Sequence, residues 1–266
     1  MASGHSGTTG GNVTQPFHGL LEIARGNIPG VSCVRKFGRN GAVGATTEDI
    51  WASGGPYTGF LQTALAVRVK AGGNAADTAA GAGAQEITIS GLDENFEPAS
   101  ETVATLGALV SLPTTTTFIR VNRAFVSEAG TYGVNNTGIV TLETTGAAIV
   151  ALISATVGQT QMAIYTIPSG QTGYLARFDV INEATSTKSV NVQLWRRERA
   201  DDVTTPFGPK RLVQAHDTLV GEKMPDLYQC MPSFPEKTDV WVSAIRTGGG
   251  ADPSVSAQFD IILVDN

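Results

Sequence analysis

Hydrophobic and polar residues alternate with a period of two along most of this chain. The segment Gly173–Asn182 shows the pattern clearly, because Tyr174, Ala176, Phe178 and Val180 occupy every second position and charged residues separate the last three. Alternation of this kind predicts a β-strand with one buried face and one polar face. We therefore expect these four side chains to share the buried face.

The same alternation recurs between clusters of Gly, Asn and Thr that are typical of turns. It predicts further strands at Leu65–Lys70, Gln85–Ser90, Glu101–Leu112, Phe118–Glu128, Ile139–Thr144, Ala148–Ser154, Thr160–Ile167, Ser189–Arg199, Arg211–Val220, Asp239–Arg246 and Ser256–Val264, and it is compatible with one at Val31–Phe37. Amphipathic helices and repeats of fixed period are absent from the pattern, which disfavours parallel α/β folds, β-helices and propellers. We predict an all-β protein, an antiparallel β-sandwich of jelly-roll type.

Residues 1–60 differ from the rest of the chain. The first eleven positions are mostly Gly, Ser and Thr, and a short apolar patch at 20–24 is soon followed by Gly26. A patch of this length is too short to form a stable helix alone. We expect an extended N-terminal anchoring arm over 1–60 and a β-sandwich domain over 61–266, with two β subdomains divided near residue 156 as an alternative for the second part.

The predicted arm carries apolar side chains that it cannot cover by itself. We expect them to contact a neighbouring subunit by strand addition or by packing in a groove. The candidate partner-binding residues are Leu20, Leu21, Ile23, Trp51, Tyr57 and Phe60. The alternative is a peripheral strand and loop that lies on its own domain.

The charge of the chain argues against several classes of partner. The formal net charge is −6 and the isoelectric point is near 5.1, so direct binding to nucleic acid is not expected. No apolar run approaches the roughly 20 residues that cross a bilayer, and no secretory signal is recognisable, so we expect neither membrane insertion nor export by that route. The one basic cluster, Arg196, Arg197 and Arg199, is followed by two aspartates and is expected to be a solvated strand end.

Candidate catalytic and metal-binding residues are sparse. The chain has three histidines, and it shows no zinc-binding spacing, nucleophile elbow or phosphate loop. His216 lies beside Asp217, an arrangement more typical of a surface pair than of a catalytic base. We predict no enzyme activity, no catalytic, metal-binding or cofactor-binding residues, and no cofactor. Cys33 and Cys230 are expected to be separate thiols, with their pairing left open.

Four segments of the sequence carry a resemblance to a known family. They are LLEIARGNIPGVSCVRKFGRN, EDIWASGGPYTGF, TIPSGQTGYL and FPEKTDVWVSAI. In this order they resemble virion structural proteins of tailed bacteriophages, especially short-tailed ones. The resemblance implies a small all-β subunit that is assembled in the host cytoplasm and located in the virion, and it supplies no active-site residues. The alanine-rich loop Ala71–Ala84 departs from the family pattern, so a partner contact there is expected to differ.

Three hypotheses follow for the function. The leading one is a tail-associated fibre or head-to-tail accessory subunit, a symmetric homo-oligomer that docks through its arm onto a tail adaptor, nozzle or collar protein. The alternative is a capsid decoration protein bound to the major capsid protein. The third is a carbohydrate-binding module for the host surface, in which solvent-facing aromatic residues stack on sugar rings. Its candidate residues are Trp51, Tyr57, Trp195 and Trp241.

Overall fold

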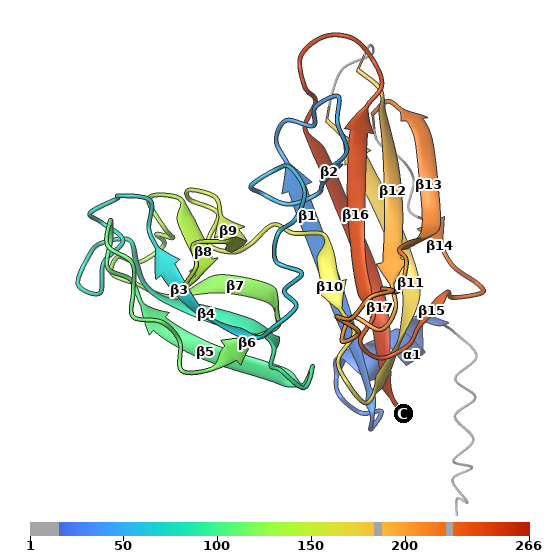
Figure 1. The fold of residues 1–266 in the computed structure, drawn as a ribbon, viewed down its shortest axis with the longest axis horizontal. Helices are drawn as coiled ribbons and strands as arrows, with labels where there is room; N and C mark the ends of the chain where they lie inside the picture. The colour runs from blue at the N-terminus through green and yellow to red at the C-terminus, as the bar shows by residue number, and fades with distance from the viewer. Residues whose placement is uncertain (1–15, 184–187, 222–225) are drawn as a thin grey trace, which may run out of the picture.

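The computed structural model describes residues 16–183, 188–221 and 226–266. In these residues the protein is an all-β structure with antiparallel sheets and one short helix, α1 (Pro16–Ala24). Figure 1 shows two β bodies side by side, with α1 at the lower end of the larger one. The predicted fold class is confirmed.

The larger body consists of two five-stranded sheets, which we call the sandwich. The first sheet contains β1 (Val31–Asn40), β17 (Val255–Asp265), β11 (Gln171–Asn182), β14 (Asp226–Leu227) and β15 (Ser233–Phe234). The second contains β10 (Ile164–Thr166), β16 (Asp239–Arg246), β12 (Val190–Arg197), β13 (Arg211–Leu219) and β2 (Glu48–Asp49). Apolar side chains of both sheets meet in one core.

The strands of the sandwich pair in the nested order of a jelly roll. The first strand, β1, pairs with the last, β17; β10 pairs with β16; β11 pairs with the short β14 and β15; and β12 pairs with β13, all antiparallel. The short β2 is not part of this pattern, and β14 and β15 together occupy the place of one strand. The resulting eight strands form one long hairpin that is rolled into two sheets, as in a jelly roll. The predicted jelly-roll arrangement is therefore present.

A β-bulge in β11 changes which side chains reach the sandwich core. The register of β11 against β17 shifts between Leu175 and Arg177. Leu175 is therefore buried before the bulge, and Phe178 and Val180 are buried after it. Tyr174 and Ala176 were expected on the same buried face and are only half-buried. That part of the prediction was wrong, because one extra residue reverses the alternation.

The smaller body is inserted between β2 and β10, and we call residues 61–159 the inserted domain. One sheet contains β3 (Leu65–Lys70), β6 (Thr117–Phe118), β8 (Val140–Thr144) and β9 (Ile149–Ile153). The other contains β4 (Ala84–Leu92), β5 (Pro98–Ala104) and β7 (Arg120–Ala129). The strand predicted at Glu101–Leu112 was too long, since β5 ends at Ala104. The inserted domain has its own apolar core, which continues into the junction with the sandwich.

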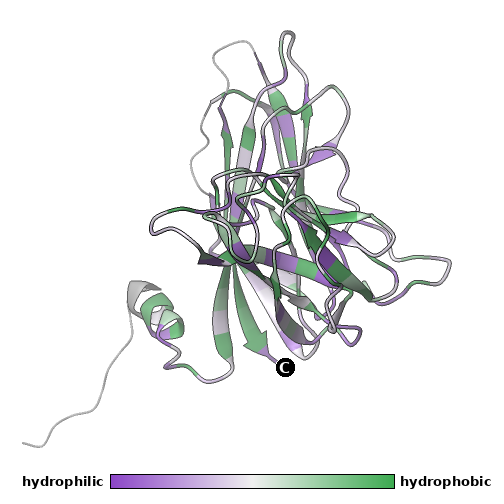
Figure 2. Ribbon diagram, turned by 90° about the vertical axis from the view of Figure 1, so that its left-hand side faces the viewer, coloured by the Kyte–Doolittle hydropathy of each residue, from purple (hydrophilic) through white to green (hydrophobic). Residues whose placement is uncertain are grey.

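Residues 31–60 belong to the β bodies, which corrects the predicted extended arm over 1–60. The whole length of β1 pairs with β17, from Val31 opposite Val264 to Asn40 opposite Val255. The sequence hides this pairing because the partner strand lies at the other end of the chain. Of the expected arm, the described part outside the β bodies is α1 with the turn that follows, and Figure 2 shows α1 standing away from the sheets.

Gly38 provides a test of how tightly β1 is packed in the sandwich. A Cβ atom at this position would lie 2.2 Å from the backbone nitrogen of Ala163 and 2.4 Å from the carbonyl oxygen of Ile50. We expect Gly38→Ala to lower the free energy of unfolding by about 1–3 kcal/mol, because backbone atoms cannot move aside as a side chain can. Gly249→Ala is the control, since a Cβ there meets nothing within 4 Å. Denaturant unfolding of both variants measures the difference, and equal stabilities would contradict this packing.

Candidate functional site

A buried ion network joins the inserted domain to the sandwich. Arg120 at the start of β7 donates from Nε to Oδ1 of Asp239 at 2.8 Å and from Nη2 to Oδ2 at 3.1 Å. Asp239, the first residue of β16, also accepts from Arg197 Nη2 at 2.6 Å and from Thr166 Oγ1 at 2.7 Å. Both Arg120 and Asp239 are buried. One carboxylate therefore holds groups from three strands of two domains.

The guanidinium of Arg120 is satisfied on its remaining sides by backbone oxygens and aromatic rings. Its Nη1 atom donates to the carbonyl oxygens of Leu61 and Ile119, both at 2.7 Å. Its Cζ atom lies 5.4 Å from the ring centroid of Phe60 and 5.5 Å from that of Phe96. Cation–π contacts of this kind are worth about 0.5–2 kcal/mol each. The network is thus fully built from this chain's own groups.

A series of aromatic rings connects the two domains beside this network. Trp51 and Tyr57 pack edge to face at 5.1 Å between centroids, Tyr57 and Phe60 at 4.9 Å, and Phe60 and Trp241 at 5.3 Å. The Tyr57 hydroxyl donates to the carbonyl oxygen of Val150 at 3.0 Å, and burial raises the pKa of this hydroxyl. The rings fill the junction between inserted domain and sandwich.

This placement corrects the predicted role of the aromatic arm residues. Trp51 and Tyr57 are 3% and 7% exposed, and Phe60 is half-buried, so they pack within their own chain rather than against a partner. Trp241 is also buried, and Trp195 is half-buried with its Nε1 donating to Ser243 Oγ at 2.9 Å. The expectation that Trp51, Tyr57 and Trp241 face solvent was wrong. For Trp51 and Tyr57 the reason is that aromatic residues near glycines look alike in a free arm and in a tight connection.

The leucines predicted on the arm lie on α1. Leu20 and Leu21 are 48% and 45% exposed, whereas Ile23 is half-buried. An ion pair of 3.2 Å between Arg25 and Glu22 lies at the end of the helix. The helix therefore carries apolar side chains that the described part of the chain leaves open to solvent.

A second group of exposed apolar residues lies on loops of the inserted domain. The buried carboxylate of Asp77 ties these loops together, since it accepts from the backbone nitrogens of Ala84 at 2.9 Å, Thr137 at 2.8 Å and Gly138 at 2.7 Å. The backbone nitrogen of Gly107 donates to the Asp77 carbonyl at 2.8 Å. The exposed side chains on these loops and their continuations are Leu106, Leu109, Leu112, Tyr132, Val134 and Ile139. Asp77 therefore holds the backbone of these loops in place. We call the six exposed side chains the loop surface.

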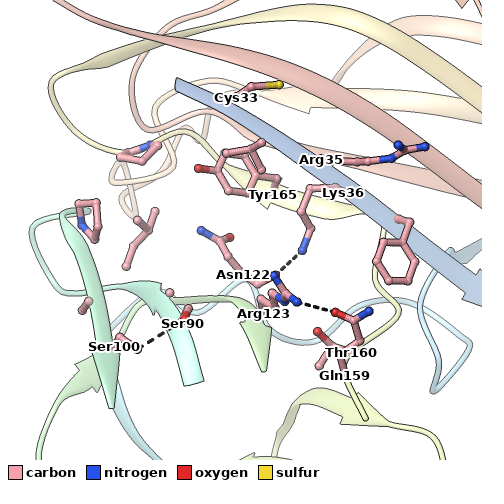
Figure 3. Close-up of a pocket in the computed structure, with 17 residues that line it drawn as sticks. Cys33, Arg35, Lys36, Ser90, Ser100, Asn122, Arg123, Gln159, Thr160 and Tyr165 are labelled. Atoms are coloured by element: carbon pink, nitrogen blue, oxygen red, sulfur yellow. Dashed lines mark hydrogen bonds between the residues drawn. The ribbon is translucent and has the colours of Figure 1, made fainter. Parts of the chain in front are cut away.

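A cleft of about 710 Å³ opens between β1 of the sandwich and the β4–β5–β7 sheet of the inserted domain. Figure 3 shows Lys36 reaching from β1 toward Asn122 and Arg123 of β7. Lys36 Nζ donates to the Asn122 carbonyl oxygen, and Arg123 Nη2 donates to Gln159 Oε1 at 2.6 Å. The cleft was missed in the sequence, because its two walls come from separate domains and neither wall carries a motif.

Other residues singled out in the sequence have structural partners. His216 Nε2 lies 3.1 Å from Asp226 Oδ2, rather than pairing with its neighbour Asp217, and its ring stacks on Phe178 at 5.6 Å. Arg197, expected at a solvated strand end, belongs to the buried network of Asp239. Cys33 and Cys230 are both free and exposed.

The described part of the chain holds no cluster of three or more residues suited to a metal ion. Within the same residues, no helix is both long and apolar enough to span a membrane.

Comparisons with known proteins give only distant likenesses. The sequence matches no known family model, and no curated protein matches it. Among solved structures, the infectious bursal disease virus VP2 subviral particle is 9% identical, with 88% of this chain and 72% of that chain covered and a TM-score of 0.26. The structure of the infectious bursal disease virus Gt strain is 9% identical, with 90% and 79% covered and a TM-score of 0.21. We draw no conclusion about this chain from likenesses this weak.

Removing one partner of the buried ion network is expected to reduce the stability of the protein strongly. We expect Arg120→Gln to lower the free energy of unfolding by about 3–5 kcal/mol, because Asp239 would stay buried with part of its charge uncompensated. Arg68→Gln is the matched control, since Arg68 pairs with Glu143 at 2.9 Å where both side chains are partly solvated. A loss of about 1 kcal/mol or less is expected there. Denaturant unfolding measures both, and equal losses would show that the network is not special.

Proposed function

We propose that this chain is a structural protein of a bacteriophage virion, a tail-associated fibre or head-to-tail accessory subunit that attaches to another virion protein through α1. The observation that carries this proposal is the position of α1. The helix stands apart from the sheets. About half of the surface of Leu20 and of Leu21 is left exposed by the described residues. The resemblance of four sequence segments to such virion proteins supports the same assignment.

The energetics of α1 favour a partner. A helix of nine residues is marginal in water, because nucleation costs more than so few hydrogen bonds return. Placing its apolar side in a groove of another protein buries the exposed half of each leucine, which contributes about half of the roughly 1.5–3 kcal/mol that complete burial of a leucine is worth. In a symmetric oligomer several copies of α1 bind together, so modest single contacts add up to firm attachment. A collar, adaptor or nozzle protein of the tail is the proposed site of attachment.

The rest of the molecule suits a passive, rigid subunit. The two domains are joined by a buried network, and the loop surface of the inserted domain offers a second apolar contact region. We assign this surface to contacts between copies or to a neighbouring virion protein. Function by adhesion needs no turnover and no cofactor, so the proposed mechanism is burial of the apolar side of α1 in a groove of the partner.

A capsid decoration protein is the second candidate. The eight-stranded jelly roll favours it, because this architecture occurs in viral capsid domains, although a fold alone does not define a function. The partner would then be the major capsid protein. Carbohydrate recognition loses Trp51, Tyr57 and Trp241 as candidate residues, since they are buried in the domain junction. Trp195 is half-buried, and Lys210 Nζ lies 4.3 Å from its ring centroid.

Charged substitutions on α1 test the attachment. We expect the double variant Leu20→Asp and Leu21→Asp to fold normally and to be incorporated at least tenfold less into particles, because aspartate cannot enter an apolar groove. Leu227→Asp is the control, since Leu227 on β14 is 75% exposed but lies on the sandwich. Complementation of a deletion phage, with quantitative immunoblots of purified particles, measures incorporation. Equal incorporation of the two variants would refute attachment through α1.

The number of copies in a particle separates the two candidates. We expect a few to a few dozen subunits for a tail location, because tail appendages are cyclic assemblies of low copy number. Hundreds of copies would identify a capsid decoration protein. Quantitative mass spectrometry of purified particles, together with immunogold labelling, makes the distinction, and absence from the particle would contradict both candidates.

A further inference from the structure

Lys36 is a buried amine with little electrostatic compensation. Its side chain projects from β1 toward Asn122 and Arg123, as Figure 3 shows, and the residue is 7% exposed. Lys36 Nζ donates to the Asn122 carbonyl oxygen, and within the described residues no carboxylate forms an ion pair with it. Burial, followed by the charge of Arg123, lowers the pKa of Lys36 to about 7. Burying an ammonium without a counter-charge is costly, so this position calls for a reason beyond packing.

Arg123 places a second cation at the same cleft. It lies on β7, is exposed, and forms its 2.6 Å hydrogen bond with a neutral group, Gln159. Its Cζ atom lies 5.1 Å from the ring centroid of Phe125, which holds the guanidinium without neutralising it. Figure 3 shows Lys36 and Arg123 converging from opposite walls of the cleft.

The remaining lining of the cleft adds neutral polar groups and no negative charge. The described lining residues include no Asp and no Glu, and the third cation, Arg35, is turned toward Gln258 and Asp260 of β17. Hydroxyl and amide side chains lie between apolar patches on the wall. The polar ones are Ser90, Ser100, Asn122, Gln159, Thr160 and Tyr165. The volume of about 710 Å³ is within the range of about 300–1,000 Å³ that is usual for small-molecule sites.

We propose that this cleft between the two domains binds an acidic sugar, whose carboxylate lies between Lys36 Nζ and the guanidinium of Arg123. Two converging cations without a carboxylate of their own are complementary to an oxyanion. Hydroxyl and amide groups around them match the hydroxyls of a sugar ring, and the apolar patches match its carbon face. The site is independent of α1 and of the attachment that α1 makes.

The protonation of Lys36 gives the binding a definite pH dependence. A lowered pKa means that the amine is charged below about pH 7 and neutral above it. The anion binds the charged form, so affinity falls as the pH rises through this value, by roughly tenfold between pH 6 and pH 8. Binding near pH 7 also takes up a proton, because the bound carboxylate favours the charged amine.

Calorimetric titration of the purified protein tests the proposal without any phage particle. The probes are sodium glucuronate, glucose as a neutral sugar of the same ring, and inorganic sulfate as a simple anion. We expect glucuronate to bind at pH 6 and to bind about tenfold more weakly at pH 8, with glucose and sulfate clearly weaker. Titrations in buffers of different ionisation enthalpy would report the proton taken up.

Variants distinguish a built site from general charge attraction. Arg123→Gln and Lys36→Gln are each expected to weaken glucuronate binding at least tenfold, and only Lys36→Gln is expected to abolish the pH dependence. Arg123 is exposed, so its substitution leaves the fold intact even where that of Lys36 does not. Lys70→Gln, at an exposed position of β3 outside the cleft, should bind like the unchanged protein. Absence of glucuronate binding, equal binding of glucose or sulfate, or equal weakening by Lys70→Gln would each overturn the proposal.

Discussion

The carboxylate of Asp239 is the point on which the arrangement of the two domains depends. It is fully buried and accepts four hydrogen bonds, from Arg120 of the inserted domain and from Arg197 and Thr166 of the sandwich. Separating the domains would leave Asp239 without Arg120, at a cost of several kcal/mol. Two cations share this one carboxylate, and the ring of Phe60 lies 5.4 Å from one guanidinium and 5.6 Å from the other. The aromatic connection and the ion network are thus one structural unit.

Fixing the domains in this way also fixes the cleft. The cleft has one wall in each domain, so a hinge motion would separate Lys36 from Asn122 and Arg123. The strand β1 supplies the sandwich wall and begins a few residues after α1 ends. A subunit attached through α1 therefore has its attachment helix next in the chain to the strand that forms one wall of the cleft. The cleft proposal rests on this rigidity, whereas attachment through α1 does not depend on it.

Local alternation in the sequence was sufficient to predict most strands, because it records which face each strand buries. Leu65–Lys70 and Asp239–Arg246 begin and end in the structure where the pattern places them. Contacts between segments far apart in the sequence cannot be predicted from local alternation. Arg120 and Asp239 are 119 positions apart, and nothing in either neighbourhood indicates their pairing. The exposed Leu20 and Leu21 were predicted from an apolar patch with nothing nearby to cover it, whereas Trp51 and Tyr57 gave the same local signal and are covered by residues far along the chain.

The contrast between a rigid body and a marginal helix explains why attachment and recognition are separated in this molecule. A preformed cleft loses little conformational entropy when it binds, so weak polar contacts are enough for selectivity. A nine-residue helix gains stability only with its partner, so binding there couples burial of Leu20 and Leu21 to stabilisation of the helix itself. Attachment then requires a groove that fits the helix. On any other surface the leucines stay exposed and the helix is not stabilised. The sandwich does not need a partner to become stable in this way, since its apolar core is formed by residues of its own two sheets.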